Sequence, residues 1–123
     1  MNKEILDTVK FNSGAELKNR IVMAPMTIQA GYFDGSVTSE MIDYYQYRSG
    51  DAAAIIVESC FVEDHGRGFP GAIGVDTDEK VKGLARLAQA IKDKGSKAIL
   101  QIYHAGRMAN PKLNEGEQPI SAS

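Results

Sequence analysis

Three short apolar runs, separated by two helical patterns, constrain the fold of this 123-residue chain more than any other feature. The runs are Ile21–Met26, Ala52–Glu58 and Lys97–Tyr103, and the middle one reads AAAIIVE. Nearly continuous apolar strands are typical of parallel sheets that are covered on both faces, whereas half-exposed strands alternate polar and apolar residues. The order strand–helix–strand–helix–strand therefore predicts an α/β fold with a parallel sheet.

Each of the two predicted helices has recognisable start and stop signals. Thr38 or Ser39 can cap the first helix, which we expect to end near Ser49-Gly50. Apolar residues recur at helical spacing over 81–91, and the acidic stretch Asp76–Glu79 precedes them. We predict that side chains of this stretch cap the second helix and that Gly95 ends it.

The loops at the two ends of the predicted sheet differ in length. Long loops follow the first strand (27–37) and the second strand (59–76), whereas the returns at Ser49–Asp51 and Gly95-Ser96 are minimal. Long loops at the carboxyl ends of parallel strands are where α/β proteins place their sites. We therefore expect a binding site at the carboxyl end of the sheet.

The number of strands raises a problem of size. A complete eight-stranded barrel needs about 250 residues, and three strands alone leave open sheet edges. The chain is then either a small three-stranded sandwich or the opening portion of a longer barrel. We favour the second: the first three β/α units of a (β/α)8 TIM barrel, preceded by a short N-terminal hairpin that turns at Ser13-Gly14.

Composition limits the partners and the location that we expect. The formal net charge is −2 with no basic cluster, which disfavours nucleic acid and membrane surfaces. No apolar run approaches the roughly 20 residues of a membrane span, and the N-terminus has no apolar signal core. The single cysteine, Cys60, cannot form an internal disulfide, which favours a cytoplasmic protein. Open sheet edges predict self-association into a homo-oligomer.

Two polar residues in the apolar runs are candidates for a site. Gln101 interrupts the run AILQIY, and a buried carboxamide needs hydrogen-bond partners. It bonds either a neighbouring strand or water, or else a ligand edge that carries C=O and N–H groups side by side. Glu58 poses the same question, and the simplest answer is an ion pair, for instance with Arg20 or Arg107.

Other chemistry-bearing residues favour structural interpretations. The glycine-rich stretch Gly66–Gly74 lacks the spacing of a phosphate-binding loop, so we expect an irregular loop. His65 and His104 are far apart in sequence, and we expect no metal site. We expect Cys60 to be a buried or half-buried thiol rather than a reactive one.

Three motifs extend this interpretation: LKNRIVMAPMT (Leu17–Thr27), IIVESC (Ile55–Cys60) and LQIYHAGR (Leu100–Arg107). Together, and in this order and spacing, they resemble the old yellow enzyme family of flavin-dependent NAD(P)H oxidoreductases. The resemblance runs from Phe11 to the C-terminal PISAS. It implies that residues 1–123 are the N-terminal part of a flavin-binding TIM-barrel domain, with FMN at the carboxyl-end mouth and NAD(P)H as reductant.

The resemblance also implies cofactor contacts for six residues. They are Ala24, Pro25, Met26, Thr27, Ser59 and Gln101. The first four would lie along the flavin, with the Thr27 hydroxyl beside its O4 and N5 edge. Ser59 falls where the family has a small residue against the flavin, and Gln101 falls on the glutamine that bonds the pyrimidine edge. Gln29 stands where some members have a tyrosine that faces the substrate.

The family's catalytic residues are not implied for this chain. Its substrate anchor and its tyrosine proton donor lie on later strands, so we expect no catalytic residue in these 123 residues. His104, Gly106 and Arg107 match the family's His-x-Gly-Arg motif, which we expect to be mainly structural. The complete protein would transfer hydride from NAD(P)H through FMN to an activated alkene or a related small-molecule acceptor. The alternatives are a truncated non-catalytic module that pairs with a partner or itself, and a TIM-barrel enzyme without flavin.

Overall fold

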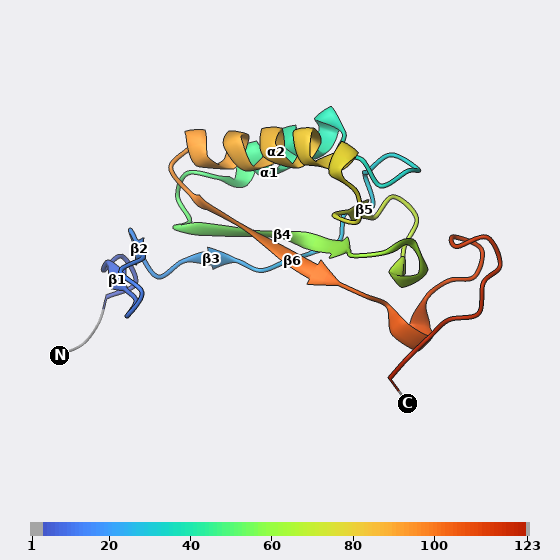
Figure 1. Ribbon diagram of the computed structural model, residues 1–123. Helices are drawn as coiled ribbons and strands as arrows, with labels where there is room; N and C mark the ends of the chain where they lie inside the picture. The colour runs from blue at the N-terminus through green and yellow to red at the C-terminus, as the bar shows by residue number, and fades with distance from the viewer. Residues whose placement is uncertain (1–3, 123) are drawn as a thin grey trace.

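A small hairpin begins the structure, a computed structural model that describes residues 4–122 (Figure 1). Its strands β1 (Val9–Lys10) and β2 (Glu16–Leu17) pair antiparallel. Gly14 in the connecting turn has a φ of +85°, in the left-handed region that glycine adopts at little cost. The hairpin predicted at Ser13-Gly14 is confirmed.

The main sheet is parallel and is built around β4 (Ala54–Phe61). Strand β6 (Lys97–Tyr103) pairs with β4 along its whole length. On the opposite edge, β3 (Val22–Met23) pairs with the start of β4 and β5 (Ile73–Gly74) pairs with its end. The predicted α/β fold with a parallel sheet is therefore confirmed, with β4 at its centre (Figure 1).

The bounds of two strands differ from the prediction, while those of Lys97–Tyr103 are confirmed. Regular pairing in the first strand covers only two residues of Ile21–Met26, because Pro25 has no N–H to donate to a neighbour. The middle strand begins at Ala54 and continues past Glu58 to Phe61, where β5 and β6 still flank it.

The glycine-rich stretch Gly66–Gly74 is less irregular than predicted. Its last two residues, Ile73 and Gly74, form β5 and extend the sheet. A short 3₁₀ turn, Asp64–Gly66, begins the stretch. The sequence does not reveal β5 because a two-residue strand has no periodicity of its own.

The first helix, α1 (Ser39–Arg48), begins and ends where the sequence predicts. The hydroxyl of Thr38 accepts a hydrogen bond from the backbone N–H of Met41 at 3.2 Å, which makes Thr38 the N-cap. The same hydroxyl donates to the carbonyl of Ala30 at 2.7 Å, so the cap also fastens the loop that follows β3.

The second helix, α2 (Val81–Asp93), corrects one prediction. A 3₁₀ turn, Asp78–Lys80, precedes it, and no side chain caps either element. The carboxylate of Asp76 instead accepts a hydrogen bond from the Lys80 ammonium at 2.6 Å. The predicted stop is confirmed: Gly95, with a φ of +90°, follows the helix and donates its N–H to the carbonyl of Lys92.

The two helices cover one face of the sheet and leave the other face open (Figure 1). The core lies between the helices and β4, and its buried residues are Met41, Tyr45, Ala52, Ile55, Val57, Cys60, Ile73, Leu87 and Ile91. On the uncovered face, Val22 is 42% exposed and Ile99 is 45% exposed. Among residues 4–122, no helix has the length and apolar character needed to cross a membrane.

Two glycines with the same backbone conformation offer a test of how tightly the loop after β3 packs. Gly35 and Gly14 have φ values of +84° and +85°, but only at Gly35 would a Cβ meet a neighbour, the Phe61 ring at 2.5 Å. We expect Gly35→Ala to lower the free energy of unfolding by about 1–3 kcal/mol more than Gly14→Ala. Both variants place an alanine at a positive φ, but only the Gly35 variant also pushes a methyl group against the Phe61 ring. Urea unfolding of both variants measures this difference, and equal losses would contradict it.

Candidate functional site

Three polar side chains come together on the uncovered face, at the carboxyl end of the sheet. Ser59 in β4 and Gln101 in β6 are register partners, and neighbouring partners in a parallel sheet point to the same face. The hydroxyl oxygen of Thr27, just after β3, lies 2.8 Å from that of Ser59. The structure therefore brings together three of the residues that the sequence assigned to a cofactor.

A β-bulge at Glu58 turns Ser59 toward this face. Register pairing passes directly from Val57 to Ser59 on β4, which leaves Glu58 without an opposite residue. Val57 and Cys60 both lie in the core under the helices, although regular alternation would place residues three apart on opposite faces. The extra residue therefore shifts the alternation, and Ser59 points away from the helices toward Thr27.

The hydroxyl of Tyr45, on α1, binds the backbone and the side chain of the bulge. It accepts a hydrogen bond from the N–H of Glu58 at 2.9 Å and donates one to Glu58 Oε2 at 3.0 Å. Both side chains are fully buried. The predicted ion pair of Glu58 with Arg20 or Arg107 is wrong, because the bulge turns the carboxyl toward the helix.

Burial dominates the acid–base behaviour of this region. It raises the pKa of Glu58, while the hydrogen bond from Tyr45 and the backbone amides of Ile28 and Gln29 oppose that rise. Burial also raises the pKa of Tyr45, and it raises the pKa of Cys60 to about 12. The Cys60 thiol donates to the carbonyl of Glu58 at 3.1 Å, and the expected buried thiol is confirmed.

Gln101 differs from its prediction in one respect. The side chain is exposed rather than buried, because nothing in residues 4–122 covers this face of the sheet. Its carboxamide makes no hydrogen bond within the described part of the chain, so the alternative in which it bonds a neighbouring strand does not hold there. An amide donor and an amide acceptor thus remain available beside Thr27 and Ser59.

The segment between β3 and Thr27 lies open to solvent. Ala24 is exposed, Pro25 is half-buried and Met26 is 51% exposed. Gln29 is exposed and has a φ of +56°, and its carbonyl lies against Gly71, where any Cβ would collide with it. The loop after β4 therefore fixes the backbone at Gln29.

His104 ties two loops together. Its Nδ1 accepts a hydrogen bond from the N–H of Gly106 at 2.8 Å, so its Nε2 carries the proton and donates to Glu63 Oε1 at 2.7 Å. The ring packs so closely on Gly66 that a Cβ there would lie 2.5 Å from it. This agrees with a mainly structural role for the motif, whose Arg107 is exposed.

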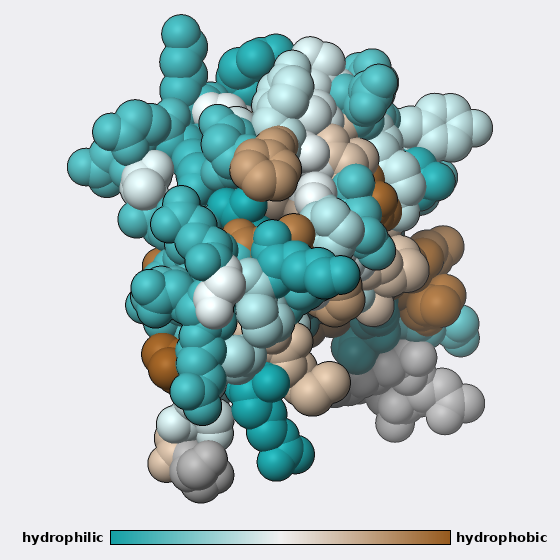
Figure 2. All heavy atoms as spheres, turned by 90° about the vertical axis from the view of Figure 1, so that its right-hand side faces the viewer, coloured by the Kyte–Doolittle hydropathy of each residue, from teal (hydrophilic) through white to brown (hydrophobic). Residues whose placement is uncertain are grey.

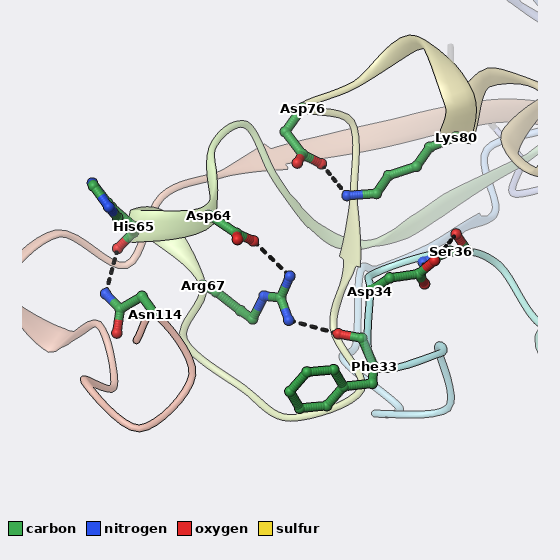
Figure 3. Close-up of polar contacts among 9 residues, drawn as sticks. All are labelled: Phe33, Asp34, Ser36, Asp64, His65, Arg67, Asp76, Lys80 and Asn114. Atoms are coloured by element: carbon green, nitrogen blue, oxygen red, sulfur yellow. Dashed lines mark hydrogen bonds and ion pairs between the residues drawn. The ribbon is translucent and has the colours of Figure 1, made fainter. Parts of the chain in front are cut away.

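A buried arginine, which the sequence analysis missed, fastens the loops at the mouth of the sheet. Arg67 donates to the carbonyl of Phe33 at 2.7 Å and to Asp64 at 2.6 Å (Figure 3). The guanidinium of Arg67 and the ammonium of Lys80 lie 4.6 and 4.9 Å from the centre of the Phe61 ring. No sequence signal marks this contact, because Phe33 and Arg67 are 34 residues apart.

The surface around this mouth is mixed in character. Figure 2 views the molecule from the side toward which β4 and β6 point, and mostly hydrophilic residues cover it, with separate hydrophobic groups between them. The hydrophobic groups do not form one continuous patch in that view.

Comparison with known proteins places this geometry in a wider context. The chain is 69% identical over 120 residues to the NADH:acrylate oxidoreductase of Vibrio harveyi. The aligned region covers 98% of this chain and 12% of that protein. It is 58% identical over 122 residues to the NADH:fumarate oxidoreductase of Klebsiella pneumoniae. Here the aligned region covers 99% of this chain and 13% of that protein. The chain therefore spans only about an eighth of these curated relatives.

Solved structures match over nearly the whole chain. The old yellow enzyme homologue from Zymomonas mobilis superposes with a TM-score of 0.90 and 33% identity, over 98% of this chain and 33% of that one. Morphinone reductase in complex with tetrahydroNAD superposes with a TM-score of 0.86 and 28% identity, over 99% of this chain and 33% of that one. These matches confirm that the fold is that of the N-terminal part of an old yellow enzyme barrel.

The match to a whole family is equally extensive. Residues 5–123 match the NADH:flavin oxidoreductase / NADH oxidase family, which is nearly the entire sequence. The fold, the three motifs and these matches agree, and the chain belongs to the NADH:flavin oxidoreductase / NADH oxidase family, of whose barrel it forms an N-terminal portion.

Proposed function

We propose that the uncovered sheet face holds one side of an FMN ring and that the complete protein is an FMN-dependent NAD(P)H oxidoreductase. The observation that carries this proposal is the carboxamide of Gln101, which has no hydrogen-bond partner in residues 4–122 and stands beside the Thr27–Ser59 pair. A carboxamide offers a donor and an acceptor side by side. That pattern is complementary to the pyrimidine edge of a flavin, which carries C=O and N–H groups in the same arrangement.

The other residues have distinct roles in this proposal. Ala24, Pro25 and Met26 present backbone groups and apolar atoms along the ring, and their exposure supports such a contact. Either hydroxyl can donate in the 2.8 Å contact between Thr27 and Ser59. In this proposal Ser59 is the donor, which leaves the Thr27 proton free to bond the O4 of the ring. When bound, the flavin supplies hydride transfer between NAD(P)H and the acceptor.

The relatives' names support a substrate class. Acrylate and fumarate, which appear in the names of the two curated relatives, are alkenes conjugated to a carboxylate. We therefore propose an activated alkene of this kind as the acceptor, and we keep Gln29 as the residue on the substrate side. The catalytic groups for that step belong to later strands of the barrel.

The remainder of the barrel is the partner that we propose for the open face and edges. Val22 and Ile99 are apolar and almost half exposed, although they belong to strands whose sequence predicts cover on both faces. Further strands that pair with β3 and β6 would cover them and remove the open edges. Self-association of the chain through the same edges is the competing outcome.

The length of the relatives favours a second candidate function. The chain makes up 12% of the acrylate oxidoreductase but 33% of the old yellow enzyme homologue, so the first protein extends far beyond one barrel. In this second candidate the barrel oxidises NAD(P)H, and the alkene is reduced elsewhere in the longer protein. The two candidates differ in where the acceptor binds and share the flavin site described above.

Replacement of Gln101 tests the flavin site directly. We expect Gln101→Leu in the complete enzyme to weaken FMN binding about tenfold, because one net hydrogen bond to the ring is worth roughly 1.4 kcal/mol. Gln89→Leu is a matched control, since Gln89 bonds Asp93 on the exposed side of α2. Fluorescence titration of the apoprotein with FMN measures both, and equal affinities for the two variants would contradict the proposal.

Thr27 should control the redox potential rather than the affinity. We expect Thr27→Ala to lower the flavin reduction potential by about 30 mV, because a hydrogen bond of roughly 1.5 kcal/mol to the negatively charged reduced ring is lost. Thr27→Ser keeps the hydroxyl and should keep the potential. Potentiometric titration of the three proteins checks this, and an unchanged potential in Thr27→Ala would remove the role given to Thr27.

A further inference from the structure

We propose that Tyr45 and Glu58 are positioning residues for this site: from behind the sheet, they hold the bulge that turns Ser59 toward Thr27. The inference rests on the proposed function, because it assigns these residues a role in tuning the bound flavin. Neither residue reaches the uncovered face: Tyr45 belongs to α1, and both side chains are fully buried on the helix side of the sheet. They would therefore act only through Thr27 and Ser59.

The first step is that the Tyr45 hydroxyl stabilises the bulge itself. A bulge leaves the backbone of its extra residue outside the ladder. Here the unpaired N–H belongs to Glu58, and the Tyr45 hydroxyl accepts its hydrogen bond at 2.9 Å. Without that hydroxyl a buried N–H loses its partner, which favours regular pairing of the strand. Regular alternation would turn Ser59 toward the helices, away from Thr27.

The second step connects the same pair to the Thr27 segment. The carboxyl of Glu58 receives a hydrogen bond from Tyr45 at 3.0 Å and also faces the backbone amides of Ile28 and Gln29. These two residues directly follow Thr27. Glu58 thus contacts α1 through its carboxyl and its N–H, and its carboxyl faces the segment that follows Thr27. Ser59 is the next residue of the same strand, so both residues of the 2.8 Å Thr27–Ser59 contact adjoin groups that Glu58 meets.

The surroundings of Glu58 act on the pKa of its carboxyl in opposite directions. The groups that face it are the Tyr45 hydroxyl from α1, Cys60 from β4 and the two amides that follow β3. Burial is the main cause that raises its pKa. Its Oε1 atom has no hydrogen-bond partner within residues 4–122, so burial opposes the ionised form more than the Tyr45 hydrogen bond and the amides support it.

A potentiometric comparison in the complete, FMN-loaded enzyme tests the inference. We expect Tyr45→Phe to lower the flavin reduction potential by a similar amount to Thr27→Ala, and the double variant to show no further shift, because both act on one hydroxyl. Tyr44→Phe is the matched control: it makes the same change at the next residue of α1, whose hydroxyl does not bond Glu58, and should leave the potential unchanged.

Glu58 supplies a second pair of variants in case Tyr45→Phe does not fold. Glu58→Gln keeps a neutral group of the same shape and should keep the potential, whereas Glu58→Ala removes the contacts to α1 and to the Thr27 segment and should lower it. A potential that stays unchanged in both Tyr45→Phe and Glu58→Ala, while their melting temperatures fall, would overturn the inference and leave a purely structural role.

Failure of the proposed function would look different. If Thr27→Ala itself left the potential unchanged, the role of Thr27 at the flavin would be wrong, whereas the positioning of Ser59 could still be read from a crystal structure of Tyr45→Phe. Loss of the Thr27–Ser59 contact in that structure would support the positioning role, and an intact contact would overturn it.

The pH dependence of stability follows from the raised pKa of Glu58. The folded chain holds this proton more tightly than the unfolded chain, whose glutamate has the ordinary value of about 4.5. The contribution of Glu58 is therefore complete below that value and is lost as the pH rises through the raised pKa of the folded state. We expect Glu58→Gln to remove this loss, as measured by urea unfolding between pH 4 and pH 9 at roughly one-unit steps. Identical pH profiles for the two proteins would contradict the raised pKa of Glu58.

Discussion

The pair of hydrogen bonds between the Tyr45 hydroxyl and Glu58 is the interaction on which the site depends. The Tyr45 hydroxyl accepts a hydrogen bond from the Glu58 N–H, which the bulge leaves outside the strand pairing. This N–H lies in the core, where a donor without a partner would destabilise the fold. The bulge in turn decides which face of β4 carries Ser59. A contact between one helix and one strand is thus linked to which side chain faces the opposite surface.

The sheet separates two different tasks. On the helix side, apolar residues of α1, α2 and β4 pack into the hydrophobic core. On the other side, Thr27, Ser59 and Gln101 share one face of the sheet, where Gln101 and its apolar neighbour Ile99 are exposed and Ser59 is buried. Arg67 and His104 hold the loops at the carboxyl end of the sheet.

Much of the fold was predictable because it follows from local patterns. The helix cap at Thr38, the stop at Gly95 and the parallel order of the strands all come from the chemistry of neighbouring residues. The failures arose where a carboxylate met a side-chain partner that the sequence pattern did not reveal. Asp76 bonds Lys80 instead of capping a helix, and Glu58 bonds Tyr45 instead of an arginine.

The sequence by itself determined the class of fold, the end of the sheet at which a site belongs, and the resemblance that assigned Thr27, Ser59 and Gln101 to a flavin. Only the tertiary structure decided that these three side chains share one face. The physical reason is that successive side chains of a strand point to opposite faces of the sheet. A single extra residue at Glu58 therefore moves each later side chain of β4 to the other face. Whether a strand accommodates such a residue depends on a partner for its unpaired N–H, and here that partner is supplied by Tyr45, 13 residues earlier in the chain.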